Sequence, residues 1–266
     1  MFWTRLASGV VLVILAIGTL WVGGWLTCGV MCLLSLGGIL ELLRVYKLHK
    51  SVPAMFAYAA TIAYYVMLYI DRTDLLMPIM MVYLLAVLAV YVLAFPKYKD
   101  KDIMPVFMSF FYVSVCLSYV FRLRDFKDGG YLVILIFICS WGNDTLAYLV
   151  GRLIGKHKMS PVLSPKKSIE GLIGGIVGAG ILGAVFGMIF NANVTPVANA
   201  PLWFGLVCMA GAIPAVIGDL AASAIKRNND IKDYGKLIPG HGGIMDRFDS
   251  MIFTAPIIFY GVSFIL

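Results

Sequence analysis

Aspartates inside strongly apolar stretches are the first residues of this sequence that could do chemistry. Asp144 lies in ICSWGNDTLAYLVG, and Asp219 lies in AGAIPAVIGDLAASAIKR. Asp246 and Asp249 begin a later apolar run and are three residues apart, so they share one face of a helix. An ionised carboxylate inside a membrane span costs at least ~2.5 kcal/mol, and it therefore usually marks a functional site. For Asp144 and Asp219, the alternative is a protonated or hydrogen-bonded side chain that only serves packing.

The positions of these carboxylates along their runs predict that they lie at one depth. Asp144 and Asp219 each precede the end of a run by about six residues, which is ~9 Å of helix. The run that starts with Asp246 and Asp249 begins on the same side. Four carboxylates at one depth would repel one another, and carboxylate oxygens together with substrate phosphates suit Mg²⁺. We therefore predict a metal site formed by all four aspartates.

Basic and hydroxyl side chains flank these acids along the chain. They are Ser223, Lys226, Arg227, Lys232, Lys236, His241 and Arg247, and, in SPKKSIEG, Lys166, Lys167 and Ser168. Lysine and arginine suit phosphate groups, and Ser168 is expected to cap a helix whose N-terminus would face phosphate. For any single lysine, the alternative is the ordinary excess of positive charge in cytoplasmic loops. His241 alone fits a cap, a ligand or a phosphate contact, and its neighbours favour a phosphate or proton role.

Glycines occur in two settings that predict different roles. Gly240, Gly242 and Gly243 lack the GK[ST] of a P-loop and the preceding strand of a dinucleotide-binding turn. They would instead let the backbone come close to a ligand. Glycines at small-xxx-small spacing in 170–190 favour helix packing over ligand binding.

The elements that must position these residues are membrane helices. Of the 266 residues, 61% are hydrophobic and 13% are charged, whereas soluble domains have about 25% charged residues. Several apolar runs reach the length of ~20 residues that spans a bilayer as a helix. We predict an all-α, polytopic integral membrane protein with about nine transmembrane helices, the first a retained anchor. The predicted spans are 6–22, 25–43, 54–70, 75–95, 104–121, 131–150, 170–190, 201–225 and 248–266.

The distribution of positive charge predicts the orientation of these helices. With a cytoplasmic N-terminus, 17 of the 21 Lys and Arg residues fall on the cytoplasmic side, as the positive-inside rule requires. The net charge of +7 is then mainly a signal of topology, and it also suits anionic lipid and nucleotide phosphates. We do not expect a nucleic-acid partner. The predicted location is the cell (inner) membrane, with the candidate site facing the cytoplasm.

The motifs of the C-terminal half resemble those of a known family. Residues 223–249 read S-x-x-K-R-x4-K-D-x-G-x3-P-x-H-G-G-x-x-D-R-x-D, which is similar to the signature of phosphatidate cytidylyltransferases, also called CDP-diacylglycerol synthases. DTLAYLVGR at 144–152 and SPKKSIEG at 164–171 also look like that family. The specific motifs cover roughly 140–266, whereas the resemblance of 1–130 rests only on hydrophobicity and the number of spans. We therefore expect N-terminal transmembrane helices at 1–130, about five spans, and a C-terminal catalytic transmembrane region at 131–266, about four spans with cytoplasmic loops.

The resemblance implies a reaction and a set of site residues. CTP and phosphatidic acid would give CDP-diacylglycerol and pyrophosphate with Mg²⁺, a second cation being left open. Composition and spacing do not show this reaction. The expected catalytic residues are Asp219, Asp246, Lys226, Arg227, His241 and Arg247. The expected phosphate-binding residues are Lys166, Lys167, Ser168, Ser223, Lys232, Gly242 and Gly243, and the expected metal ligands are Asp144, Asp219, Asp246 and Asp249.

Two other functions fit parts of the pattern. A CTP-dependent lipid kinase would use similar acids and lysines but would transfer the γ-phosphate. A cation-coupled transporter would explain acids within the membrane, but carriers tend to place them at the midplane between inverted repeats, and the sequence shows no evident repeat. The oligomeric state stays open, a homodimer being one option.

Overall fold

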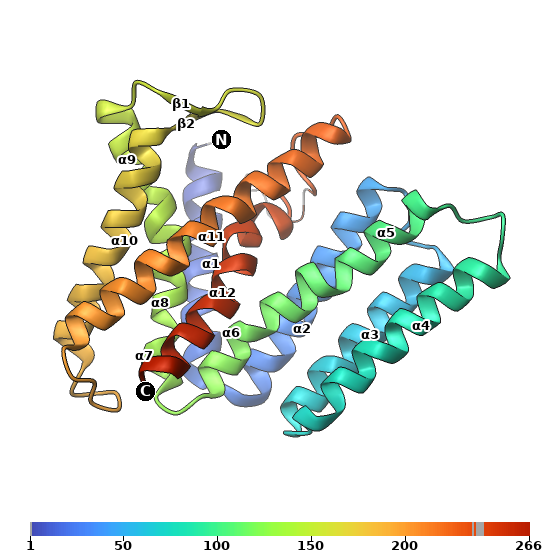
Figure 1. The fold of residues 1–266 in the computed structure, drawn as a ribbon, viewed down its shortest axis with the longest axis horizontal. Coiled ribbons are helices and arrows are strands. Elements are labelled where there is room, and N and C mark those ends of the chain that lie inside the picture. The colour runs from blue at the N-terminus through green and yellow to red at the C-terminus, as the bar shows by residue number, and fades with distance from the viewer. Residues whose placement is uncertain (1, 236, 238–241) are drawn as a thin grey trace. The chain divides into compact units, whose positions relative to one another are not determined.

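The structure is a computed structural model that describes residues 2–235, 237 and 242–266, with the backbone alone for residues 2–8. Eight helical stretches of this described part are long and apolar enough to cross a membrane (Figure 1). They are Gly24–Val45, Val52–Tyr69, Thr73–Leu93, Asp100–Asp125, Gly129–Ile154, Ile169–Phe190, Ala200–Asn228 and Met245–Ile265. Each coincides with a predicted span, so the all-α, polytopic class is confirmed.

The first predicted span, 6–22, corresponds to helix α1, Phe2–Val22. Its stretch with described side chains, Gly9–Val22, is apolar but shorter than the eight others. Gly23, at φ 72°, separates α1 from the next helix. A positive φ is easily adopted by glycine, which explains why the hairpin turns at this point.

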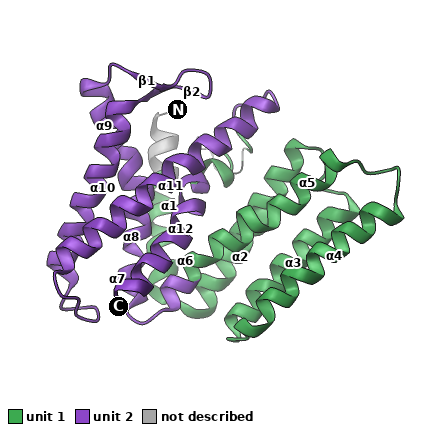
Figure 2. Ribbon diagram, viewed as in Figure 1, with its two compact units in different colours: residues 1–121, 233–247 green, residues 122–232, 248–266 purple. Residues whose placement is uncertain are grey.

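The chain forms two compact units, which Figure 2 shows in different colours. The first unit consists of residues 1–121 and 233–247, and the second consists of residues 122–232 and 248–266. The described residues of 233–247 therefore group with the N-terminal helices, although they lie far from them in the sequence. The sequence-based division at residue 130 concerned function, and it stays a prediction.

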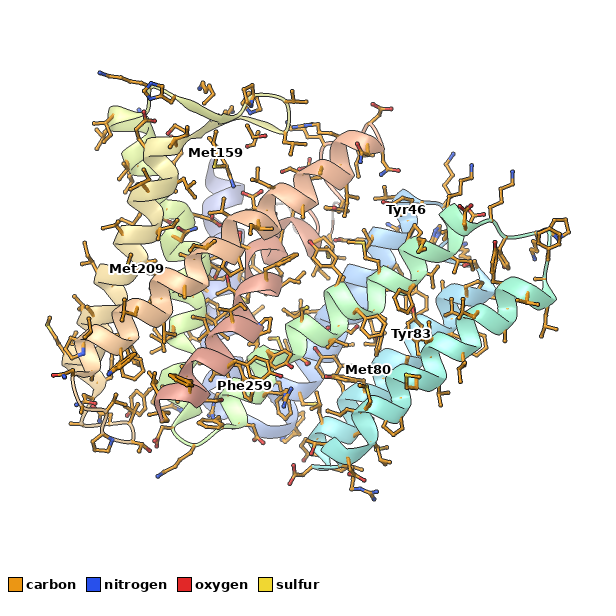
Figure 3. The ribbon with its side chains drawn as sticks, in the orientation of Figure 1. Tyr46, Met80, Tyr83, Met159, Met209 and Phe259 are labelled. Carbon is orange, nitrogen blue, oxygen red and sulfur yellow. The ribbon has the colours of Figure 1, made fainter. Side chains whose placement is uncertain are left out.

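The first unit is a set of helices around an aromatic core. Its elements are α1, α2 (Gly24–Val45), α3 (Val52–Tyr69), the 3-10 turn η1 (Thr73–Leu75), α4 (Leu76–Leu93), α5 (Asp100–Ser109), the π-helical turn η2 (Phe110–Val115) and most of α6 (Cys116–Asp125). Tyr83 of α4 lies against Phe110, with ring centroids 4.7 Å apart (Figure 3). Its hydroxyl donates to the carbonyl oxygen of Val106 at 2.6 Å, so the buried ring also satisfies its polar end.

The second unit holds the remaining helices and one small β-hairpin. Its elements are the end of α6, α7 (Gly129–Leu132), α8 (Ile134–Phe137), the π-helical turn η3 (Ile138–Gly142), α9 (Asn143–Ile154), strands β1 (Lys158–Ser160) and β2 (Ser164–Ser168), α10 (Ile169–Phe190), α11 (Ala200–Asn228) and most of α12 (Met245–Ile265). The two strands pair antiparallel. This hairpin, which carries Lys166 and Lys167, was not predicted from the sequence.

Glycines of α10 let this helix approach two neighbours closely. A Cβ atom at Gly175 would meet Asn143 and Ala147 of α9, and one at Gly183 would meet the backbone of Phe204 in α11. Between these two positions, a Cβ atom at Gly180 would meet the side chain of Met209 in α11, which is labelled in Figure 3. The prediction that these glycines serve helix packing is confirmed.

Candidate active site

An ion pair between Lys167 and Asp219 lies at the centre of the candidate site in the second unit. Lys167 is the penultimate residue of β2, and its ammonium group contacts Oδ2 of Asp219 in α11. One turn further along α11, the hydroxyl of Ser223 donates to Oδ1 of Asp219 at 3.4 Å. The two charged side chains are 27% and 25% exposed. Because both stay partly open to solvent, a ligand can reach them.

A serine connects the two other acids of this unit. The hydroxyl of Ser250 donates to Oδ2 of Asp144 at 3.1 Å, and its backbone N–H donates to Oδ1 of Asp249 at 2.8 Å. Asp144 belongs to the first turn of α9, whereas Asp249 and Ser250 lie on α12. Residues of two helices that are distant in sequence are therefore held together at one position.

The three carboxylates lie within electrostatic range of one another. Asp249 interacts with both Asp219 and Asp144, and it is also close enough to Lys226 to be stabilised by that cation. Asp144 interacts with Asp219 and with Lys167. The predicted meeting of acids from the three helices α9, α11 and α12 thus occurs for these three residues.

The helices that carry these acids can approach because of a glycine. Gly218 precedes Asp219, and a Cβ atom there would collide with the backbone carbonyl of Asp249 and the ring of Phe253. The absence of a side chain at Gly218 therefore brings α11 and α12 together beside their carboxylates.

The donor types of this cluster suit a hard divalent cation. Three carboxylates offer oxygen ligands, and their mutual repulsion favours a bound cation. In the side-chain positions of the described residues, no three acidic, histidine or cysteine groups are arranged as a metal site. The ammonium group of Lys167 lies against Asp219 instead. Metal binding by all of these acids together therefore requires their side chains to rearrange.

Other residues predicted for phosphate binding have different surroundings. Ser168 is buried, and its hydroxyl oxygen accepts a hydrogen bond from the Gly171 N–H at 3.1 Å, so the predicted N-cap of α10 is confirmed. Its role in phosphate binding stays a prediction. Lys166, Arg227 and Lys232 have exposed side chains. Their roles in phosphate binding or catalysis stay predictions.

The rest of the signature lies in the first unit. Oδ2 of Asp246, in the first turn of α12, accepts hydrogen bonds from the N–H groups of Tyr234 at 2.8 Å and Gly243 at 3.0 Å. Gly242 has φ +88°, a conformation that favours glycine. Arg247 is exposed. In this structure, Asp246 thus joins the backbone at Tyr234 to the backbone at Gly243, a role that the sequence did not predict.

Three predicted residues of the segment 233–247, Lys236, Gly240 and His241, lie outside the described residues. Two residues that were not predicted from the sequence contribute to the observed geometry. One is Ser250, which follows Asp249 directly. The other is Glu41, whose carboxylate accepts a hydrogen bond from the Met245 N–H at the start of α12. Glu41 lies near the end of an apolar run, so the rule for acids within membrane spans could have identified it.

Comparisons with known proteins agree with these motifs. A family model described as "Cytidylyltransferase family" matches residues 3–265. A "Phosphatidate cytidylyltransferase" of Staphylococcus haemolyticus is 34% identical over 260 residues, which cover 96% of each chain. One of Staphylococcus epidermidis is 32% identical with the same coverage, and one of Staphylococcus aureus is 32% identical over 65% of this chain and 64% of its own. On this evidence, the chain belongs to the cytidylyltransferase family.

Proposed function

We propose that this protein transfers the cytidylyl group of CTP to phosphatidic acid, giving CDP-diacylglycerol and pyrophosphate. The observation that carries the proposal is the match to relatives of that name over 96% of both chains. The acids and lysines that the structure brings together in the second unit suit this chemistry. The comparisons give no support to a lipid kinase or a transporter.

The reaction is a displacement at phosphorus. An oxygen of the lipid phosphate attacks the α-phosphorus of CTP, and the bond from this phosphorus to the oxygen shared with the β-phosphate breaks. Pyrophosphate leaves with the electron pair of that bond. No covalent intermediate with the protein is needed, because the lipid phosphate is itself the nucleophile.

The basic side chains would hold and orient the phosphates. Lys167 and Lys226 lie near the carboxylates, and charge-assisted contacts from them would stabilise the negative charge that grows on the leaving pyrophosphate. When a phosphate replaces Asp219 as the partner of Lys167, the Asp219 carboxylate becomes available to a cation. The hydroxyl of Ser223, which donates to Asp219, would change its hydrogen bond in the same rearrangement.

Mg²⁺ would be held by Asp144, Asp219 and Asp249. When bound, it would neutralise charge on the attacking and leaving oxygens of the phosphates. The expectation from the sequence signature that Asp246 also binds the metal stays a prediction, since Asp246 belongs to the first unit. This proposal is tested by treating the protein with a chelator, which should stop the reaction, and then adding Mg²⁺, which should restore it.

The proposed orientation places the hairpin β1–β2 and the end of α11 at the cytoplasmic face of the cell membrane. CTP is a soluble nucleotide, whereas phosphatidic acid presents its phosphate at the bilayer surface. A site that uses both must lie where lipid meets water. The clustering of Lys and Arg in the segments 151–169 and 226–247 supports the cytoplasmic side.

Labelled CTP tests the reaction directly. Purified protein with phosphatidic acid and Mg²⁺ should transfer label from the α-phosphorus of CTP into the lipid, while label from the γ-phosphorus should appear in pyrophosphate. A lipid kinase would give the reverse, with γ-label in the lipid and CDP released. Label in neither product from folded protein would contradict both enzyme functions.

A further inference from the structure

We propose that Glu41 is a positioning residue, which fixes the backbone at Gly235 and at residues 243–245 and so places Asp246 and Arg247 for the reaction. The proposal rests on the proposed function for the reaction that is affected. Glu41 lies in α2, within the first 45 residues, where neither the sequence motifs nor the predicted site residues occur. All of the contacts described below lie within the first unit.

The carboxylate of Glu41 caps the start of helix α12. Its Oε2 accepts a hydrogen bond from the N–H of Met245 at 3.0 Å, across 204 residues of sequence. The N–H of Ile244 is also within hydrogen-bonding reach of this carboxylate. The first N–H groups of a helix have no partner within the helix, and negative charge is favourable at that end. A side chain of α2 thus does for α12 what a local capping residue would do.

The segment also surrounds the Glu41 carboxylate with two glycines. A Cβ atom at Gly235 would collide with Oε1, and a Cβ atom at Gly243 would collide with Oε2. The absence of a Cβ atom at both positions lets the backbone pass this close to the carboxylate. The backbone at Gly235 and the backbone at Gly243 therefore both pack against the Glu41 carboxylate, one against each oxygen.

Packing on α2 adds to this contact. A Cβ atom at Gly37 would meet the side chain of Ile244, and one at Gly38 would meet the sulfur of Met245. Ile244 and Met245 are 5% and 0% exposed. One face of α2 thus receives both residues before Asp246, and Glu41 supplies the polar part of that face.

The consequence concerns Asp246, the acid that follows this anchor. Its Oδ2 accepts hydrogen bonds from Tyr234 and Gly243, and this places it beside the backbone that is fitted to Glu41. Glu41 and Asp246 therefore both hold one backbone segment. A displacement of this backbone would move Asp246 and Arg247 together, and small displacements of reacting groups reduce rates strongly.

The burial of Glu41 argues that its carboxylate has a functional role. Its residue is 4% exposed and lies in a membrane span, where a carboxylate is costly unless hydrogen bonds compensate. Apolar packing by Ile244 and Met245 alone could have held the segment without this cost. The alternative role is nevertheless a purely structural anchor, and the experiment must separate positioning from stability.

The test compares Glu41→Gln with Ser35→Ala in the full-length protein. The glutamine side chain keeps the shape of glutamate, but its NH₂ group cannot accept hydrogen bonds. Ser35 is a buried residue of the same helix whose hydroxyl contacts Tyr65 at 2.9 Å, away from the segment. Hydrogen exchange of the Ile244 and Met245 amides should be at least ~10-fold faster in Glu41→Gln and unchanged in Ser35→Ala.

The kinetic readout uses label transfer from CTP per folded protein. In Glu41→Gln, kcat should fall ~10- to 100-fold, while Ser35→Ala keeps the wild-type value. Unchanged amide exchange in folded Glu41→Gln would overturn the proposal, and so would faster exchange with normal kcat. If wild-type protein transfers no label, the proposed function fails, whereas the exchange measurement still tests whether Glu41 fixes the segment.

Gly235→Ala provides a second variant if Glu41→Gln does not fold. The added methyl group would push against the Glu41 carboxylate from the side of the segment. It should by itself reproduce the faster exchange and the lower kcat. Where Glu41→Gln does fold, the double variant should lose less than the sum of the two single effects. Wild-type exchange and kcat in Gly235→Ala would contradict the proposal.

Discussion

Lys167, on a short strand outside the membrane helices, pairs with Asp219 inside the span α11, 52 residues later in the chain. The pair brings a basic residue of one motif to an acid of another. An isolated carboxylate at this depth would be costly, and the ammonium group compensates for that cost in the absence of substrate. A negatively charged phosphate can replace Asp219 as the partner of Lys167. A positively charged metal ion can likewise replace Lys167 as the partner of Asp219.

Asp219→Asn should reduce the rate of label transfer by at least ~10²-fold, because it removes charge from the proposed metal site. The matched control is Asp230→Asn, since Asp230 is an exposed acid just beyond the end of α11, and its positive φ of 52° suits asparagine. The control should keep the wild-type rate. Near-normal turnover by folded Asp219→Asn would refute the assignment of Asp219 to the metal.

Lys167→Gln should weaken CTP binding and lower the rate, each by about 10-fold, because one charge-assisted phosphate contact is lost. Lys158→Gln is the control, since Lys158 is an exposed lysine of the same hairpin. Steady-state kinetics over a range of CTP concentrations measures both effects. Equal behaviour of the two variants would mean that Lys167 contributes only to the general positive charge of the hairpin.

Gly183→Ala should lower the free energy of unfolding by about 1–3 kcal/mol, because the added methyl group would strike the backbone and Cys208 of α11. Gly29→Ala is the control, since no atom lies within 4 Å of a Cβ at that position. Thermal unfolding in detergent measures the difference. If both variants unfold at the wild-type temperature, the close packing at Gly183 does not contribute to the stability of the protein.

Single cysteines at Val162 and Ala198 should react from opposite sides of the membrane. Val162 is exposed at the tip of the hairpin before α10, and Ala198 is exposed in the loop after it. In a protein without its five native cysteines, an impermeant reagent applied to intact cells should label Ala198→Cys alone. Labelling of Val162→Cys from outside would reverse the proposed orientation of α10.

The sequence determined the membrane class and the approximate limits of the spans, because a helix must cross the bilayer with an apolar surface of sufficient length. It also identified Asp144, Asp219 and Asp249, because charges are rare within such runs. The glycine spacing of α10 was sufficient to predict close helix packing, since this pattern acts within one helix face. The family motifs then related these residues to a reaction that composition alone could not show.

The tertiary structure decided which partners these residues have. The pairing of Lys167 with Asp219 depends on a hairpin whose strands are too short to leave a clear pattern in the sequence. Likewise, Glu41 reaches Met245 because α2 packs against a segment some 200 residues away. Hydrogen bonds across such separations depend on the folded backbone, and local sequence patterns report only on neighbours along one helix or strand.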